Sequence, residues 1–173
     1  ASSPASNAAA APSTGSAFAR SIYSDTKMQT SHEVYGTFTT MPTAFATALS
    51  FAGTDLTENN QYRLVINPTG STTFVDIRRI DGAGASTTIM SAVDLGIAAV
   101  NGNSCGVRVS GTTISVYWKW TDGIWYRIGE FTDSNLSSLP STGVYGGIAG
   151  GSPSVIDNYG AGPFVDQPAQ DPP

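Results

Sequence analysis

The fold of this chain is decided by the stretch Val107-Arg108-Val109-Ser110-Gly111-Thr112-Thr113-Ile114-Ser115-Val116-Tyr117-Trp118. Apolar and polar residues alternate on both sides of Ser110-Gly111, which is the pattern of two strands joined by a tight turn. Thr121-Asp122-Gly123 supplies a second turn before the run Ile124-Trp125-Tyr126-Arg127-Ile128. This succession predicts an antiparallel arrangement of short strands.

The same alternation continues toward both ends of the chain. In Met28 to Thr39, the residues Val34, Gly36 and Phe38 share one face and Tyr35 lies on the other. Further strands are expected over residues 17–24, 45–52, 62–67, 74–80, 87–90, 105–110, 112–120, 124–131, 143–147 and 154–160. Val93 to Val100 is the best candidate for a single helical turn. The sequence therefore predicts an all-β sandwich with little or no helix.

The length of 173 residues suits one domain. Residues 1–16 are rich in Ala and Ser and carry no charge, so they are expected to be a linker or loop. Residues 17–162 are expected to form the sandwich. Residues 163–173 are Pro-rich and are expected to be an extended tail, because proline cannot donate a hydrogen bond to a sheet.

Composition and charge exclude several classes of function. The net charge is -5, and the tightest basic pair is Arg78-Arg79, so nucleic-acid binding is not expected. No apolar run approaches the length of about 20 residues that a membrane span needs, so membrane insertion is not expected either. The single cysteine, Cys105, permits no internal disulfide and is expected to be a buried small hydrophobe.

Several segments together resemble the concanavalin A-like (laminin G-like) jelly-roll family. The matching segments, in chain order, are His32 to Phe38, Tyr62 to Ile66, Val107 to Val116, Asp133, Gly143 to Ile148 and Ile156 to Tyr159. The resemblance covers roughly residues 17–162 and implies an antiparallel two-sheet jelly-roll sandwich of a kind that mostly binds glycans or other surface ligands.

One departure from the family pattern concerns the first strand. Many members begin with an upstream strand that pairs with the closing strand, and residues 1–16 hold no such motif. That strand is missing, supplied by another chain, or replaced by the Ala/Ser-rich segment. The low-charge composition also resembles domains in minor tail proteins of actinobacterial phages, which implies a virion (tail) or extracellular location, other virion subunits as partners, and a homo-oligomer such as a trimer.

No residue pattern indicates an enzyme. Glycosidases of this family carry carboxylates grouped on one strand, as in Glu-x-Asp-x-x-Glu, whereas Glu33, Glu58 and Glu130 are far apart in this sequence. His32 is the only histidine, and no Gly-x-Ser-x-Gly motif accompanies it. His32 is expected to be a surface or edge-strand residue. A single histidine and a single cysteine are too few for a zinc site.

Calcium is a second question, because members of the broader family often bind it through carboxylate and carbonyl oxygens. Asp133, Asp157 and Asn158 are the candidate ligands. The alternative, which we favour, is that Asp157 and Asn158 fix a strand end through hydrogen bonds to the backbone. No other cofactor is expected.

The best candidates for ligand binding are aromatic residues near the Asp122-Gly123 turn. Alternation places Ile114, Val116 and Trp118 in the core, and Ile124, Tyr126 and Ile128 facing inward. The candidate ligand-binding residues are Trp125, Tyr117, Trp120, Arg127 and Lys119. Sugar rings stack on exposed aromatic planes of this kind. The alternative is ordinary cross-strand packing of the rings.

Two functional classes follow from these observations. The preferred class is a non-catalytic module for glycan binding or adhesion to a bacterial cell surface, as part of a phage tail or similar assembly. The alternative is a purely structural virion or surface domain. A third possibility is a secreted glycan-binding module of a larger enzyme.

Overall fold

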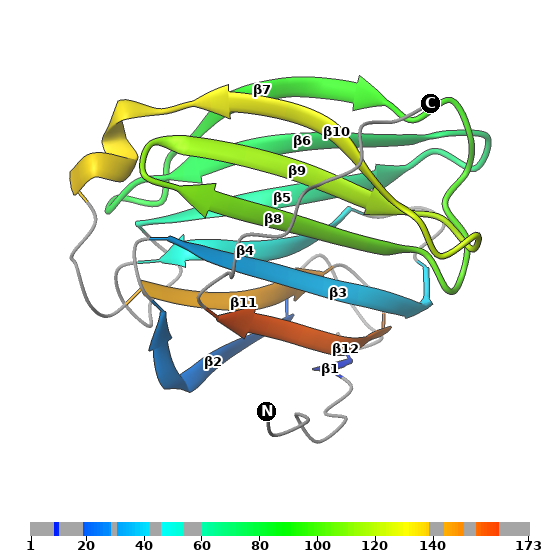
Figure 1. The fold of residues 1–173 in the computed structure, drawn as a ribbon, viewed down its shortest axis with the longest axis horizontal. Helices are drawn as coiled ribbons and strands as arrows, with labels where there is room; N and C mark the ends of the chain where they lie inside the picture. Colours follow the sequence, from blue (N-terminus) through cyan, green and yellow to red (C-terminus); the bar gives the residue numbers. More distant parts are fainter. Residues whose placement is uncertain are drawn as a thin grey trace.

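The computed structural model describes residues 9–10, 19–28, 31–41, 46–53, 60–138, 144–150 and 155–162. These residues form two six-stranded sheets whose neighbouring strands are all antiparallel (Figure 1). Sheet A contains, in spatial order, β1 (Ala9–Ala10), β12 (Val155–Gly162), β3 (His32–Thr40), β8 (Ser104–Ser110), β9 (Thr113–Lys119) and β10 (Trp125–Thr132). Sheet B contains β2 (Ala19–Met28), β11 (Val144–Gly150), β4 (Thr47–Gly53), β5 (Gln61–Pro68), β6 (Thr73–Ile80) and β7 (Ser86–Asp94).

The predicted all-β, two-sheet antiparallel sandwich is confirmed. Within the described residues the one helix is η1, a short 3-10 helix over Ser134–Ser138. No helix in this part of the chain is long and apolar enough to cross a membrane. Figure 1 looks onto sheet A, with sheet B behind it and β7 beside β10 at one edge.

The hairpins form where the sequence places glycine in turns. Gly111 has a φ of +59° between β8 and β9, and Gly123 has a φ of +84° between β9 and β10. Side chains with a Cβ rarely adopt this left-handed region, so glycine allows the tight connections. In the first hairpin Ser110 pairs directly with Thr113, which fixes the register of β8 against β9.

The core fills the space between the inner faces of the two sheets. Sheet A contributes Phe38 and Trp118, whose rings stack with centroids 6.4 Å apart. Leu49, Leu64 and Ile77 of sheet B are also fully buried in the same cluster. Burying each such side chain contributes about 1.5–3 kcal/mol to stability. Because successive side chains of a strand point to opposite faces, the buried positions determine which residues face outward.

The Ala/Ser-rich segment supplies a short first strand. Ala9 pairs with Ile156 and Ala10 with Val155, so β1 lies beside the closing strand β12. Of the three alternatives for the first strand, the structure therefore shows replacement by this segment. Residues 1–8, 11–16 and the Pro-rich segment 163–173 lie outside the described residues, and the division into linker, sandwich and tail stays a prediction.

Two local predictions are wrong. Val93 to Val100 is not a helical turn: β7 extends through Asp94, and the loop that follows bonds to distant groups, with the Ala99 amide donating to Thr73 Oγ1 at 2.8 Å. His32 is not a surface or edge-strand residue. It is fully buried in β3, between β12 and β8, because it has the same alternation phase as Val34.

Gly36 lies where β3, β12 and β4 approach one another in the core. A Cβ at this position would lie 2.5 Å from Cγ2 of Ile156, which is fully buried. We predict that Gly36→Ala lowers the free energy of unfolding by about 1–3 kcal/mol, because the core must shift to accept the methyl group. Urea denaturation measures this loss.

Gly82→Ala is the matched control, because the added methyl group would meet the side chain of exposed Asn60 rather than the core. Equal stability of wild type and Gly36→Ala would contradict the close approach of Ile156.

Candidate functional site

The outer face of sheet A gathers side chains from four neighbouring strands, β3, β8, β9 and β10. Cross-strand pairing arranges them in three rows. The rows are Thr37–Ser104–Lys119–Trp125, Tyr35–Gly106–Tyr117–Arg127 and Glu33–Arg108–Ser115–Glu130. We call this surface the aromatic face, after the three rings that it carries.

Gly106 lies at the centre of the aromatic face and pairs with Tyr35 on one side and Tyr117 on the other. A Cβ on Gly106 would lie 3.3 Å from Cβ of Tyr35 and 3.5 Å from Cζ3 of Trp125. Trp125 belongs to β10, so its indole reaches across β9 to lie against β8. Glycine thus provides the space in which the indole lies over the sheet.

The exposure of the rings differs along the face. Tyr35 is 39% exposed, and Tyr117 and Trp125 are half-buried. This combination of a fixed position and partial access to solvent suits a ring that contacts a ligand.

Cations lie close to two of the rings. Lys119 Nζ is 5.4 Å from the centroid of Trp125, and Arg108 Cζ is 5.7 Å from the centroid of Tyr117. Both distances fall in the range of cation–π attraction. These cations also hold the rings in place, because each one contributes about 0.5–1 kcal/mol at a solvent-exposed site.

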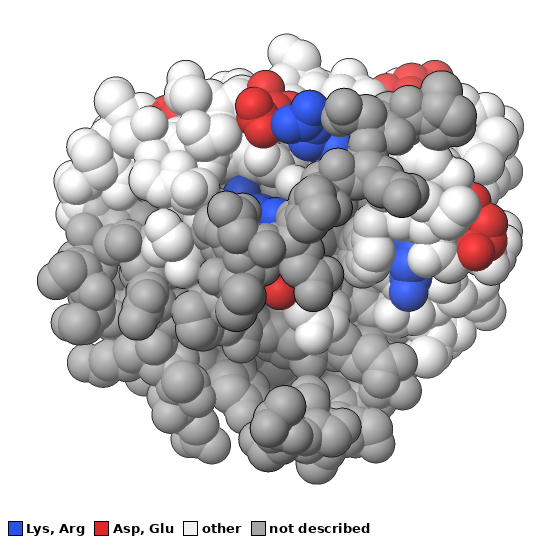
Figure 2. Space-filling model, in the orientation of Figure 1, with Lys and Arg blue, Asp and Glu red and all other residues white. Residues whose placement is uncertain are grey.

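Two carboxylates neutralise the arginines of the aromatic face. Arg108 Nη2 lies 3.4 Å from Glu33 Oε2, and Arg127 Nη1 lies 2.9 Å from Glu130 Oε2. Figure 2 shows acidic and basic residues side by side on the side of the molecule that sheet A presents. The face is therefore polar and mixed in sign around its rings, and it is not a broad basic patch.

The structure brings together four of the five predicted ligand-binding residues. Tyr117, Lys119, Trp125 and Arg127 all project from the outer side of β9 and β10.

Trp120 does not join them. It packs against the core, with its ring centroid 5.6 Å from that of Trp118, because residues two apart in an extended chain share a side. Tyr35, Gly106 and Arg108 also belong to the site, although no sequence motif marks them. The alternation signal placed Tyr35 opposite the core, but nothing in the sequence showed that β3, β8 and β9 are neighbours.

The inward prediction for β10 holds in part. Ile128 packs against the core at a bulge between Arg127 and Gly129. Ile124 is 43% exposed, contrary to the prediction, because β10 begins one residue later. Its amide instead donates to Asp122 Oδ1 at 2.9 Å in the turn.

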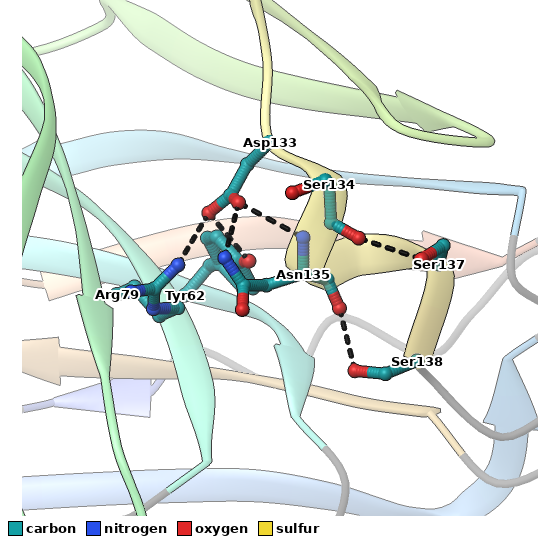
Figure 3. A network of polar contacts seen from close by, with 7 residues as sticks. All are labelled: Tyr62, Arg79, Asp133, Ser134, Asn135, Ser137 and Ser138. Carbon is teal, nitrogen blue, oxygen red and sulfur yellow. Dashed lines mark hydrogen bonds and ion pairs between the residues drawn. The ribbon is translucent and has the colours of Figure 1, made fainter.

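Asp133 lies in a buried network away from the aromatic face (Figure 3). Tyr62 and Arg79 donate to its Oδ2, each at 2.9 Å, and the backbone and side-chain amides of Asn135 donate to its Oδ1 at 2.9 and 2.6 Å. Tyr62 and Arg79 belong to sheet B, while Asp133 directly follows β10 of sheet A. The network therefore ties one sheet to the other and anchors the start of η1.

These contacts decide the ionisation of the network. Burial alone would raise the pKa of Asp133, but the hydrogen bonds from Asn135 and Tyr62 and the charge of Arg79 outweigh it and hold the pKa below its usual range. Burial and the Asp133 carboxylate together raise the pKa of Tyr62. Asp133 is thus ionised and Tyr62 is a neutral donor near neutral pH.

The three calcium candidates do not meet in one site. Both oxygens of Asp133 accept from protein donors, one of them cationic, so the carboxylate acts as a structural acceptor. Asp133 lies at the beginning of β9, where its backbone amide donates to the carbonyl oxygen of Thr112. Asp157 lies at the opposite end, because it pairs with Thr37 in the row that contains Lys119, the last residue of β9. The length of β9 separates the two ends by about 20 Å. Within the described part of the chain, no group of three His, Cys, Asp or Glu residues is arranged to hold a metal ion.

Cys105 is fully buried, as predicted. Burial raises the pKa of its thiol, so the neutral form prevails and the side chain acts as a small hydrophobe.

The sequence of this chain matches no known protein family and no curated protein. Its structure is similar to several solved proteins. The enzymatically active domain of tailspike protein 2 of bacteriophage CBA120 has a TM-score of 0.61 and 11% identity, over 85% of this chain and 24% of that one. A heptameric SAP-like pentraxin of Limulus polyphemus has a TM-score of 0.54 and 12% identity, over 90% of this chain and 76% of that one.

A xylan beta-1,4-xylosidase of Bacillus halodurans C-125 has a TM-score of 0.54 and 14% identity, over 75% of this chain and 27% of that chain. This chain therefore spans about a quarter of the length of the xylosidase and of the tailspike domain. At these identities the likenesses define a class by fold alone: an antiparallel two-sheet jelly-roll sandwich.

The Asp133 network predicts a specific loss of stability in acid. Asp133 has a carboxyl pKa of about 3.9 in the unfolded chain and a lower one in the fold, so its stabilisation is complete above about pH 5 and is lost as pH falls through the lowered pKa. Asp133→Asn should lower the free energy of unfolding by about 2 kcal/mol near neutral pH. The deficit relative to wild type should shrink in acid, as measured by urea denaturation from about pH 7 to about pH 3.

Asp122→Asn removes an exposed carboxylate and controls for the change in net charge. A deficit for Asp133→Asn that is the same at every pH would contradict the assigned ionisation.

Proposed function

We propose that this chain is a non-catalytic glycan-binding module of the concanavalin A-like type, and that the aromatic face is its binding surface. The observation that carries the proposal is the indole of Trp125 lying against Gly106, between Tyr35 and Tyr117, which pair with Gly106 on its two sides. The three aromatic residues come from three different strands, so the sheet and not the local chain places them on one surface.

The chemistry of the aromatic face matches that of a sugar. A sugar ring presents C–H groups on its faces, which pack on aromatic planes, and hydroxyl groups around its rim, which need donors and acceptors. The face offers the rings of Tyr35 and Trp125 beside the hydroxyls of Thr37 and Ser104. The sheet holds these groups on rigid strands, which lowers the entropy lost on binding.

The carboxylates of the face support a binding role over hydrolysis. Glu33 and Glu130 end the same row, and three strand spacings place their backbones about 14 Å apart. Glycosidase carboxyl pairs lie about 5–9.5 Å apart. Each carboxylate is also engaged in an ion pair with an arginine of the face.

The proposed setting is a virion (tail) or other extracellular assembly that contacts a bacterial cell surface, with the chain as a homo-oligomer such as a trimer alongside other virion subunits. The shared fold of a phage tailspike domain and of a heptameric pentraxin supports this setting, since the sandwich occurs there within a longer chain or a heptamer. Likewise, the match to a quarter of a xylosidase keeps a module of a larger enzyme as the third possibility.

A purely structural assembly domain is the second candidate. It is favoured by the cation–π contacts of Arg108 with Tyr117 and of Lys119 with Trp125, which stabilise the rings without any ligand. In this case the aromatic face would be cross-strand packing on an outer surface.

Binding to a glycan array, followed by calorimetry on a bound glycan, separates the two candidates. We expect Trp125→Ala and Tyr117→Ala each to weaken binding about tenfold or more, because each removes a stacking plane. Ile124→Ala is the matched control: it truncates an exposed apolar residue next to Trp125 that belongs to the turn and not to the face.

Circular dichroism and urea denaturation establish that each variant is folded. Full affinity in folded Trp125→Ala and Tyr117→Ala would place the site elsewhere. Absence of binding by folded wild type, in whichever oligomeric state it adopts, would favour the structural candidate.

A further inference from the structure

We propose that the aromatic face selects glycans that carry a carboxylate, and that Lys119 receives that group. This inference rests on the proposed function and names the class of ligand. It follows from the row Thr37–Ser104–Lys119–Trp125, whose cation forms no ion pair with any of the described residues, whereas the arginines of the other two rows each pair with a carboxylate.

Among the described residues, no carboxylate neutralises Lys119 of the aromatic face. Arg108 has Glu33 and Arg127 has Glu130, whereas Lys119 forms no ion pair with any of the described residues. Its ammonium lies 5.4 Å from the centroid of Trp125 instead. The ring supports the positive charge but leaves its hydrogen-bond donors available to a ligand.

A pair of hydroxyls lies next to Lys119 in the same row. Thr37 Oγ1 and Ser104 Oγ are 2.8 Å apart, and Ser104 pairs directly with Lys119 across β8 and β9. One hydroxyl proton forms the bond between the two oxygens, so the other proton remains to donate. Ser104 is buried and Thr37 is half-buried, so Thr37 is the hydroxyl that a ligand can reach.

The spacing of these groups fits a sugar acid. Two strand spacings put the backbones of Thr37 and Lys119 about 10 Å apart, the scale of one or two sugar rings. A sugar lying along the row would place its carboxylate on Lys119 and a hydroxyl on Thr37, beside the indole of Trp125, which extends across β9 to Gly106. A bond from an ammonium to a carboxylate is charge-assisted and stronger than one to a neutral hydroxyl.

A neutral sugar in the same position would be bound less tightly. It would cover the ammonium of Lys119 and displace its water without supplying a negative charge. The row therefore discriminates between an acidic sugar and its neutral counterpart, while Trp125 and Tyr117 contribute to both. This division of roles predicts different effects for variants of Lys119 and of Trp125.

Calorimetry with trigalacturonic acid and with its carboxyl-reduced form tests the inference, and sialyllactose with lactose provides a second matched pair. We expect the wild type to bind the acidic member of a pair about tenfold more tightly or better. Lys119→Gln should abolish the preference and keep the weaker neutral binding, and Lys119→Arg should keep the preference. Raising the ionic strength should reduce the preference in the wild type.

Arg78→Gln is the matched control, since it removes the same charge from β6 of sheet B. Arg78→Gln should leave the preference for the acidic glycan unchanged. Trp125→Ala should weaken the binding of both members of a pair.

Five outcomes are decisive. Loss of the preference in Lys119→Gln alone supports the inference. Equal affinity for both members of each pair, or a preference that survives in Lys119→Gln, overturns it and leaves the proposed function intact. Binding to neutral glycans of the array, with no binding to any acidic glycan, also overturns the inference and leaves the proposed function intact. A folded wild type that binds no glycan at all overturns both the inference and the proposed function.

Discussion

Burial of the inner faces of the two sheets is the constraint on which the rest of this structure depends. Side chains alternate along a strand, so the burial of Val34, Val107 and Trp118 against sheet B forces their neighbours in the chain to face outward. A slip of one residue would expose this core, so the register is strongly specified. The same register places the aromatic face on the outer side of sheet A. Tyr35 and Tyr117 face outward because their chain neighbours Val34 and Trp118 face the core.

Two glycines adapt the sheet to its neighbours on opposite sides. Gly36 faces the core and leaves room for Ile156, whereas Gly106 faces outward and leaves room for the indole of Trp125. Gly36 pairs with Cys105 and Gly106 with Tyr35, so the two positions are adjacent in the ladder between β3 and β8. The same ladder therefore closes the core on one side and provides a platform for the rings on the other.

Alternation and turn chemistry were sufficient to predict the strands and the fold class, because these depend on local patterns. The β8–β9–β10 succession was read directly from the Gly111 and Gly123 turns. The errors have two kinds of cause. His32 and Trp120 each share the alternation phase of a core residue, Val34 and Trp118, so the pattern of the sequence itself indicates that they face inward. The neighbours of Gly106 were out of reach, since the order of strands in a sheet depends on contacts between distant segments. Similarly, the loop after β7 is set by its bonds to Thr73 and not by its own apolar spacing.

The fold identifies no ligand by itself, since the same sandwich occurs in a tailspike domain, a pentraxin and a xylosidase of very different sequence. The functional claim rests on the placement of one indole. The most direct test of that placement is to titrate the protein with a glycan that it binds and to monitor the NMR signals of its three indole N–H groups. The account predicts that the signal of Trp125 shifts in proportion to saturation while those of core-packed Trp118 and Trp120 remain in place. An unshifted Trp125 signal at saturation would contradict it.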